Sequence, residues 1–545
     1  MFSAHSRRGL RYNRTLAGAL SWQNGRGMFE QNYHRSFRTL ALFALALCSL
    51  GWLASCGPMP APAVKKKPAP KKVAQKPAAK PAQASPKTAN NNANDEPPSR
   101  PFLPQVPESD APIKPRKAGT LSDLVKRGEA TQNDLPELDD GKIAAAGIRK
   151  LTGKHLILYT DVPATVEEVQ KLPQIFDLAV PELCKYFGVD PSKLEQWKLV
   201  GCLIEDKPRF QGCGLYNGDV PDFPNGFHKG SQFWLYNQPS DYYRRHLMIH
   251  EGVHAFMSHW LGGAGPPWYS EGMAELLGTH EWDGQQLKLG FNPPDKTQVP
   301  YWGRVKIVRD EYAAQRGMTL LDIFRYDGQA HLKNEAYGWC WAATSFLNQH
   351  PQTREAFLAL KTDTQDRSIE FSRRLHEKLK PQWPEIAEDW QLYVMQLEYG
   401  YDVARAATVR KESVPLPAAG ATVNVAADRA WQSTGFEVTA GKTYEISASG
   451  RYQLAREPKP WMAEPNGITI EYHQGQPLGI LLAAVTSPAA AVNAISPLAT
   501  PDIIGTSGRL TPRHNGTLYL SLNDSPSKLA DNSGACTVQI REVMP

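Results

Sequence analysis

Short runs of apolar residues separated by polar stretches begin near residue 150 and predict strands. Aliphatic and aromatic residues dominate at 155–159, 199–204 and 233–236, and polar or turn-forming residues bound each run. Runs of this length and composition are typical of buried strands. Apolar residues at helical spacing over 166–187 predict a helix between the first two strands, with Pro173 near a point where it can break.

A second helix is predicted over 241–260, directly after the third strand. Ser240 and Asp241 are good N-cap residues, and Gly262-Gly263 ends the apolar pattern, as glycines do beyond a helix. The apolar residues at helical spacing are Ile249, Val253, Phe256, Met257 and Trp260. This pattern would pack one face of the helix on a core and turn His250 and His254 towards a cleft.

The pattern changes again towards the C-terminus. Residues 304–404 are mainly of helical type, and 337–347 form a strongly apolar helix. From about residue 414 onward Pro, Ala, Gly, Ser and Thr dominate, and short alternating runs appear at 436–438, 444–448, 468–470, 518–522 and 537–540. Short strands separated by turn residues are typical of a β-sandwich. We therefore predict an α+β domain at 121–405 and an all-β sandwich domain at 415–545.

The N-terminal part has a different composition. An apolar stretch at 40–53 follows two arginines and is too short for a comfortable membrane span, so it fits the apolar core of a signal peptide. Met28 would give that signal an ordinary length if translation starts there. Residues 57–120 are rich in Ala, Pro, Lys and Asn, cannot build a core, and are predicted to form a disordered tether.

The basic charge of the chain belongs to these N-terminal segments. The whole chain has a net charge of +6, whereas residues 1–120 hold nineteen Lys and Arg against five Asp and Glu. Residues 121–545 therefore carry a net charge of −8. A mildly acidic folded part gives no indication of nucleic-acid binding. The tether is expected to be a solvated spacer, with contact of its lysines to an anionic lipid or cell-wall polymer as the alternative.

Seven cysteines are present, two of them in the signal region. The lipobox of bacterial lipoproteins is resembled by the sequence Leu53-Ala54-Ser55-Cys56. This resemblance implies a signal peptide at 1–56 and lipidation of Cys56. The alternative is a simple secretory signal that is cleaved nearby. Neither the lipobox cysteine nor the others show metal-binding C-x-x-C spacing. An exported chain can form disulfides, and we expect either buried free cysteines or one bond, with Cys202–Cys213 as the pair.

The helix predicted over 241–260 carries the most informative motif, His250-Glu251-Gly252-Val253-His254. Residues four apart lie on one face of a helix, so both histidines can direct a ring nitrogen at one ion. Imidazole and carboxylate ligands suit Zn²⁺, which in catalytic sites takes three protein ligands and keeps one position for water. Glu251 is placed to take the proton of that water.

The third ligand comes from the segment that follows, Trp268-Tyr269-Ser270-Glu271-Gly272-Met273-Ala274-Glu275. A metzincin would need Gly and His where Met257 and Trp260 stand, which excludes that subclass. The W-x-x-E-G-x-A pattern resembles the third-ligand helix of gluzincins, such as the thermolysin-like and aminopeptidase families. The resemblance implies a zincin-like metallopeptidase fold, with Glu271 as the third zinc ligand. Glu275, one turn later, could hydrogen-bond a ligand histidine, or be a solvated surface acid.

Further candidates lie beyond this motif. The helix at 337–347 resembles the lower-subdomain helix of collagenase-like gluzincins, where a tyrosine commonly opens the helix near the metal. Tyr337 is thus a candidate for oxyanion stabilisation, with a purely structural tyrosine as the alternative and His331 as a weaker candidate for the role. Three other histidines are expected at the surface or in packing: His246, His259 and His280.

The end of the chain has a second resemblance. Leu522-Asn523-Asp524, followed by Asp531-Asn532-Ser533-Gly534 and a final strand, resembles the galactose-binding bacterial lectin A family. That family binds sugar hydroxyls through Ca²⁺, which implies Asp524, Asp531 and Asn532 as calcium ligands. Lys528 stands where the family supplies a further oxygen. The alternative is a sandwich domain whose Asp and Asn residues make turns.

The expected protein is a lipid-anchored zinc metallopeptidase of the bacterial cell envelope, facing the periplasm or exterior and resembling peptidase-MA-like families. Its substrates would be extracytoplasmic proteins or glycoproteins, with an endopeptidase favoured because no clear amine-anchoring motif is present. One alternative is a cell-surface glycan-binding protein with an inactive or incidental zinc domain, although the intact Glu251 argues against inactivity. In a third arrangement, the lectin-like domain holds a glycan ligand while the zinc site cuts.

Overall fold

The computed structural model describes residues 135–328, 333–487 and 494–543. All described residues belong to one compact unit of the chain. The predicted signal, the tether, Cys56 and His331 lie outside the described residues. None of the described helices is both long enough and apolar enough to cross a membrane.

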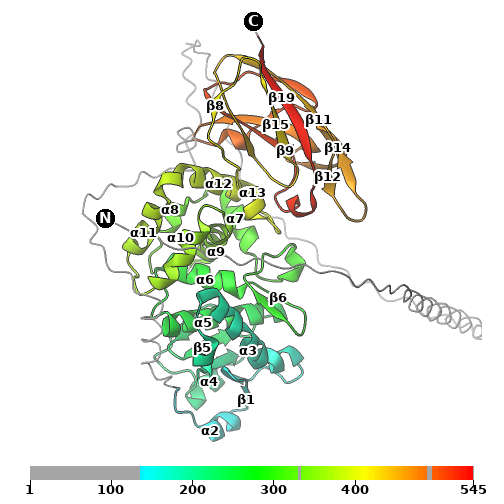
Figure 1. Cartoon of the computed structure of the whole chain (residues 1–545). Helices are drawn as coiled ribbons and strands as arrows, with labels where there is room; N and C mark the ends of the chain where they lie inside the picture. The colour runs from blue at the N-terminus through cyan, green and yellow to red at the C-terminus, as the bar shows by residue number, and fades with distance from the viewer. Residues whose placement is uncertain (1–134, 329–332, 488–493, 544–545) are drawn as a thin grey trace, which may run out of the picture. The chain divides into compact units, whose positions relative to one another are not determined.

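A five-stranded mixed sheet forms the first layer of the fold (Figure 1). Its strands are β1 (Arg149–Thr152), β2 (Leu156–Thr160), β3 (Leu199–Ile204), β4 (Gly226–Lys229) and β5 (Gln232–Tyr236), in the order β1-β2-β3-β5-β4. The central strands β2, β3 and β5 are parallel, while β1 and β4 run antiparallel at the two edges. All six residues of β3 are buried, as a strand covered on both faces requires.

The three predicted strands are confirmed to within one residue, but both edge strands were missed. The strand just before the 241–260 helix, β5, is not an edge strand, because it pairs on both sides, with β3 and with β4. The short strand β4 takes the edge position instead. Its sequence, Gly-Phe-His-Lys, contains no run of apolar residues, and none of these four residues is fully buried. The apolar pattern therefore gave no sign of this strand.

The helices predicted around the sheet are present. Helix α3 (Glu167–Phe187) continues unbroken through Pro173 and Pro181, so the predicted break does not occur. Helix α5 (Asp241–Trp260) begins at Ser240, whose side chain accepts a hydrogen bond from the Tyr243 amide, as a Ser N-cap should. It is followed by α6 (Pro267–Gly278), and α9 (Asn334–Gln349) covers the predicted apolar helix.

Helices α3, α5, α6 and α9 share one large hydrophobic core. Its fully buried side chains include Trp268, Trp302, Trp339 and Trp390. The other α-helices and strands of this region are α2 (Asp140–Ala145), α4 (Lys207–Cys213), α7 (Arg304–Ala313), α8 (Leu320–Ile323), α10 (Arg354–Ala359), α11 (Ile369–Leu379), α12 (Trp383–Gln396), α13 (Val403–Ala406) and the hairpin β6 (His280–Trp282) and β7 (Leu287–Leu289). The region is therefore of mixed α and β structure, and the helical type predicted for 304–404 is confirmed.

Of the two alternatives for the cysteines, buried free thiols are confirmed and the Cys202–Cys213 bond is wrong. All five described cysteines are free, and Cys202 and Cys213 lie unbonded in a separate small core on the other side of the sheet. Burial raises the pKa of the Cys202 thiol. These cysteines therefore act as small apolar side chains.

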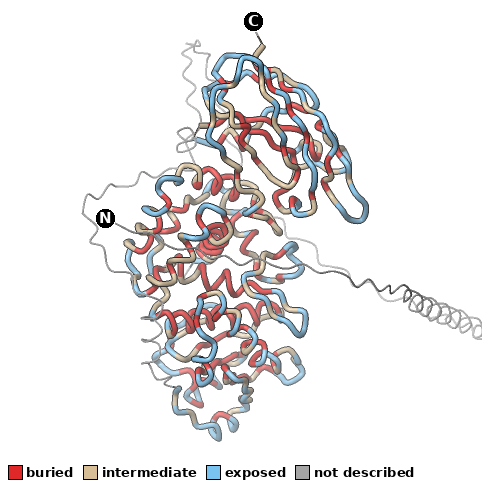
Figure 2. Tube along the Cα trace, in the orientation of Figure 1, coloured by how far each residue is buried: buried red, intermediate tan, exposed pale blue. Residues whose placement is uncertain are grey.

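Two sheets that share a core, and a separate two-stranded sheet of β12 and β13, form the C-terminal region (Figure 2). One sheet has the order β14-β15-β18-β10-β8, with β16 paired to β15, and the other has the order β17-β11-β19-β9. The strands are β8 (Val414–Pro415), β9 (Ala421–Ala426), β10 (Gln432–Val438), β11 (Thr443–Ser449), β12 (Tyr452–Ala455), β13 (Trp461–Ala463), β14 (Asn466–His473), β15 (Gln476–Thr486), β16 (Asp502–Ile503), β17 (Ser507–Leu510), β18 (Gly516–Leu522) and β19 (Ala535–Val543). Strand β19 alternates between buried and exposed positions over most of its length, so one face lies on the core.

Candidate metal centre

Three side chains from two helices bring their donor atoms to one point. His250 and His254 lie one turn apart on α5, and their Nε2 atoms are 3.2 Å apart. Glu271, from α6, places Oε2 3.4 Å from His250 Nε2 and 3.6 Å from His254 Nε2. The three residues predicted as zinc ligands are thus the ones that the fold brings together.

The spacing of these atoms fits a tetrahedral ion. Two donors each about 2.05 Å from Zn²⁺, with a tetrahedral angle between them, lie about 3.3 Å apart. The observed separations of 3.2, 3.4 and 3.6 Å are close to this value. The two imidazoles and one carboxylate are also a ligand set that zinc accepts in catalytic sites.

The position of Glu271 depends on how closely α6 packs against α9. A Cβ atom on the neighbouring Gly272 would lie 2.8 Å from the carbonyl oxygen of Cys340 and would overlap the Thr344 side chain. Only glycine lets the two helices approach this closely. The Thr344 hydroxyl donates a hydrogen bond to the Gly272 carbonyl, which joins the helices at the same level.

The second nitrogen of each histidine also has a polar neighbour. Ser270 Oγ lies 3.2 Å from His254 Nδ1, and Glu275 Oε1 lies 3.3 Å from His250 Nδ1. Partners on Nδ1 orient the imidazole rings and leave Nε2 of each ring for an ion. The geometry between Glu275 Oε1 and His250 Nδ1 does not meet the criteria for a hydrogen bond, so we describe it as a close polar contact.

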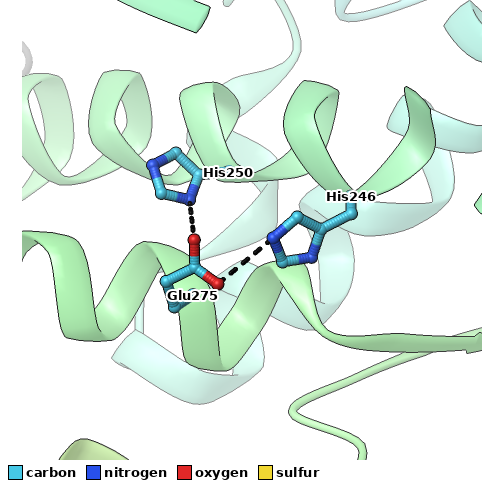
Figure 3. Close-up of side chains that lie close together, drawn as sticks. All are labelled: His246, His250 and Glu275. Atoms are coloured by element: carbon cyan, nitrogen blue, oxygen red, sulfur yellow. Dashed lines mark ion pairs between the residues drawn. The ribbon is translucent and has the colours of Figure 1, made fainter. Parts of the chain in front are cut away.

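Glu275 belongs to a buried charge network rather than to the surface (Figure 3). Its two oxygens accept hydrogen bonds from Arg304 Nε and Nη2, each at 2.8 Å. Its Oε2 also lies 3.3 Å from His246 Nε2, and His246 is fully buried. Burial alone would raise the pKa of Glu275, but Arg304 holds it well below its usual range. Glu275 is therefore an ionised carboxylate behind His250.

His246, His250 and Glu275 form a second trio of potential metal donors. The Arg304 guanidinium occupies both Glu275 oxygens, and its fixed positive charge would repel a cation at that point. His250 also takes part in both trios, through a different nitrogen in each. The trio of His250, His254 and Glu271 is therefore the candidate ion site, and Glu275 supports it.

Glu251 lies beside these ligands and is 5% exposed. Burial raises the pKa of its carboxyl group. Gly226 of the edge strand β4 passes against this carboxylate, because a Cβ atom added at Gly226 would overlap Glu251 Oε1. The missed edge strand thus runs directly past the predicted base.

The candidate oxyanion residue Tyr337 lies near the same ligands. Its ring centroid is 6.1 Å from that of His250, and the Arg304 guanidinium lies 5.6 Å from the centre of the tyrosine ring. Burial is the main cause that raises the pKa of its hydroxyl, so the group stays protonated and can donate a hydrogen bond. Arg304 contacts both Tyr337 and Glu275.

His228 on β4 is a neighbour that sequence reasoning missed. Its ring lies 6.4 Å from that of His254, roughly parallel to it, and its Nε2 donates to the Gly230 carbonyl oxygen at 2.7 Å. Desolvation of the half-buried ring, together with His254, lowers the pKa of His228 to about 4, so the ring is neutral at pH 7. Arg304 was missed as well. The sequence around His228 or Arg304 does not indicate which residues either side chain contacts in the fold.

Of the histidines expected at the surface or in packing, His259 and His280 pack as expected, whereas His246 faces Glu275. His246 and His280 are buried, with the His280 ring stacked on Tyr242 at 4.6 Å, and His259 is half-buried. Burial is the main cause that lowers the pKa of each of these three histidines.

The predicted calcium residues are only partly brought together. Asn532 Nδ2 donates to Asp524 Oδ2 at 2.7 Å, and Asn532 Oδ1 is buried without a hydrogen-bond partner. Asp531 instead accepts from the Arg456 amide at 3.0 Å. Lys528 forms its ion pair with Glu471. Burial raises the pKa of Asp524 to about 6.

Comparisons with known proteins show only limited resemblance. No protein-family model matches the chain, and no curated protein matches it. Among the solved structures that match is one described as the EclA N-terminal domain, a PllA-like lectin. It is 22% identical, the match covers 22% of this chain and 95% of that one, and the TM-score is 0.18.

Proposed function

We propose that the mixed α and β region is a zinc-dependent peptidase domain of the gluzincin type, with His250, His254 and Glu271 holding the ion. The observation that carries the proposal is the donor spacing of 3.2–3.6 Å, which matches one tetrahedral zinc ion. The partners on Nδ1 of both histidines support the same assignment.

The residues around the ligands have the chemistry that peptide hydrolysis needs. A bound zinc ion would acidify a water molecule and polarise a carbonyl group. Glu251 accepts the proton of the attacking water and passes it to the leaving amine, a role suited to a carboxyl group whose pKa is raised by burial. Tyr337 donates a hydrogen bond to the carbonyl oxygen as negative charge develops there.

Strand β4 provides the surface for an extended substrate. It pairs with β5 on one side, and no other described strand pairs with it. An extended peptide can add to such an edge through main-chain hydrogen bonds. Gly226 would then place the peptide beside Glu251, which favours peptides and unfolded protein segments as substrates.

Cleavage of a mixed peptide library by the full chain tests this proposal. The wild type should cleave internal peptide bonds, and Glu251→Gln should fold and bind zinc but lose cleavage. His259→Ala is a matched control, because His259 is a half-buried histidine of the same helix outside the ligand trio. Equal activity in wild type and Glu251→Gln would reject the peptidase and favour a glycan-binding protein with an incidental zinc domain.

We further propose that the C-terminal sheets bind a glycan through calcium held by Asp524 and Asn532. Support comes from the buried Asn532 Oδ1, an oxygen without a hydrogen-bond partner beside an acidic side chain. A hard cation would satisfy both groups. Binding on a glycan array that requires calcium and is lost in Asp524→Ala would support this function, and absence of binding to every glycan would reject it.

An envelope location is likewise our proposal. It rests on the lipobox-like sequence that ends at Cys56 and on the apolar stretch before it. Metabolic labelling with a fatty-acid analogue should modify the full chain and leave Cys56→Ser unlabelled. Equal labelling of both chains, or of neither, would reject a lipid anchor at this cysteine.

A further inference from the structure

A pocket of about 640 Å³ lies on the outer side of helix α7, between the start of the helix and Tyr399. Val299 and Val305 are buried and form an apolar floor, while Tyr301 and Tyr399 line the sides. Tyr301 is 67% exposed and has a φ angle of 70°, a conformation that costs energy in a bulky residue. The fold thus leaves the Tyr301 ring exposed to solvent at the mouth of an apolar pocket.

The rim of this pocket is cationic. Lys296, Lys306 and Arg309 line it, against a single acid, Asp310. Lys306 pairs with Asp310, while Lys296 and Arg309 form no ion pair with another described residue. Because residues 121–545 carry a net charge of −8, this concentration of positive charge is a local exception. Long-range attraction would bring an anionic partner to this point.

We propose that this pocket is a docking site for an acidic peptide segment that contains an apolar side chain. The apolar floor favours a hydrocarbon side chain, because a sugar hydroxyl placed against the valines would lose its hydrogen bonds to water. The unpaired cations favour carboxylates on either side of it. The ligand class is therefore a protein segment in which Glu or Asp flank an aromatic or aliphatic residue.

The position of the pocket connects it to the metal centre, so this inference rests in part on the proposed function. Ser240, the N-cap of α5, donates a hydrogen bond to the Pro300 carbonyl oxygen at 3.1 Å, which places the pocket wall at the start of α5. At 1.5 Å per residue, His250 lies about 15 Å further along that helix. An extended chain needs at least about five residues to cover this distance. A substrate held at both points would carry its acidic segment at least that far from the cleaved bond.

Binding can be measured independently of cleavage. The probe is a fluorescein-labelled nonapeptide with one phenylalanine between pairs of glutamates, added to the full chain carrying Glu251→Gln in EDTA. We expect saturable binding that weakens at least about tenfold in Lys296→Glu/Arg309→Glu. Tyr301→Gly should weaken binding severalfold while relieving the φ angle, so loss of folding cannot explain its effect.

Matched controls make the result specific. Lys378→Glu/Lys459→Glu makes the same change in net charge at exposed lysines elsewhere and should bind the probe as the parent does. Peptides with glutamine for glutamate, or serine for phenylalanine, should bind weakly. An equal effect of the control variant, equal binding of the glutamine peptide, or equal competition by a sulfated heparin fragment would overturn the proposal. Because zinc and catalysis are absent from the assay, its outcome is separate from that of the peptidase proposal.

Discussion

Removing the Glu275 carboxylate should destabilise the protein strongly, even without metal. Glu275 is fully buried and accepts two hydrogen bonds of 2.8 Å from Arg304, which is itself 8% exposed. In Glu275→Ala the guanidinium would remain in the core without its counter-charge. Breaking a buried pair from one side typically costs about 3–5 kcal/mol. We therefore expect a loss of this size in the free energy of unfolding.

The assay is urea unfolding of the full chain in EDTA, so that zinc binding does not contribute to stability. Glu275→Ala/Arg304→Met should be more stable than Glu275→Ala, because the second change removes the unpaired charge. Zinc affinity of the folded variants should fall about 10- to 100-fold, since His250 loses the carboxylate behind it. A loss below about 1 kcal/mol in Glu275→Ala, or purely additive effects in the double variant, would refute this reasoning.

Three other predictions concern single positions. Gly226→Ala should displace the Glu251 carboxylate and lower the rate of hydrolysis at unchanged zinc content; an unchanged rate would show that β4 does not pass against the base. Gly272→Val should overlap Thr344 between α6 and α9 and lower the free energy of unfolding by at least about 1–3 kcal/mol, measured in urea. Because burial raises the pKa of Asp524 from 3.8 to about 6, the folded state binds more protons there, and stability should fall as pH rises through that window. Urea midpoints at pH 4, 5 and 7 should show this fall reduced in Asp524→Asn, and identical pH profiles would contradict it.

Local sequence signals predicted the helices of the candidate site but not the strand beside it. The 241–260 helix has a Ser cap, a helical apolar pattern and terminal glycines, and these signals agree with one another. Strand β4 has only four residues and no buried side chain, so its position at the edge depends on pairing with β5. Short edge strands of this kind carry little periodicity of their own.

The ligand trio was predictable, whereas the network behind it was not. His250 and His254 are fixed by helical spacing, and Glu271 by the motif that follows. The Arg304–Glu275 pair joins residues 29 positions apart, and His228 lies near His254 of α5 from strand β4. Contacts of this kind exist only once the fold is formed. The cysteines are a related case, since spacing alone does not give connectivity and left a Cys202–Cys213 bond open beside free thiols.

Equilibrium dialysis against Zn²⁺, with metal content measured per folded chain, tests the central claim most directly. We predict one tightly bound zinc ion in the wild type and in Glu251→Gln. His254→Ala and Glu271→Ala should each lose it, since each removes one of three protein ligands. His259→Ala should retain the ion. A wild type that binds no zinc, or a Glu271→Ala variant that binds it as tightly as the wild type, would contradict the metal centre proposed for this protein.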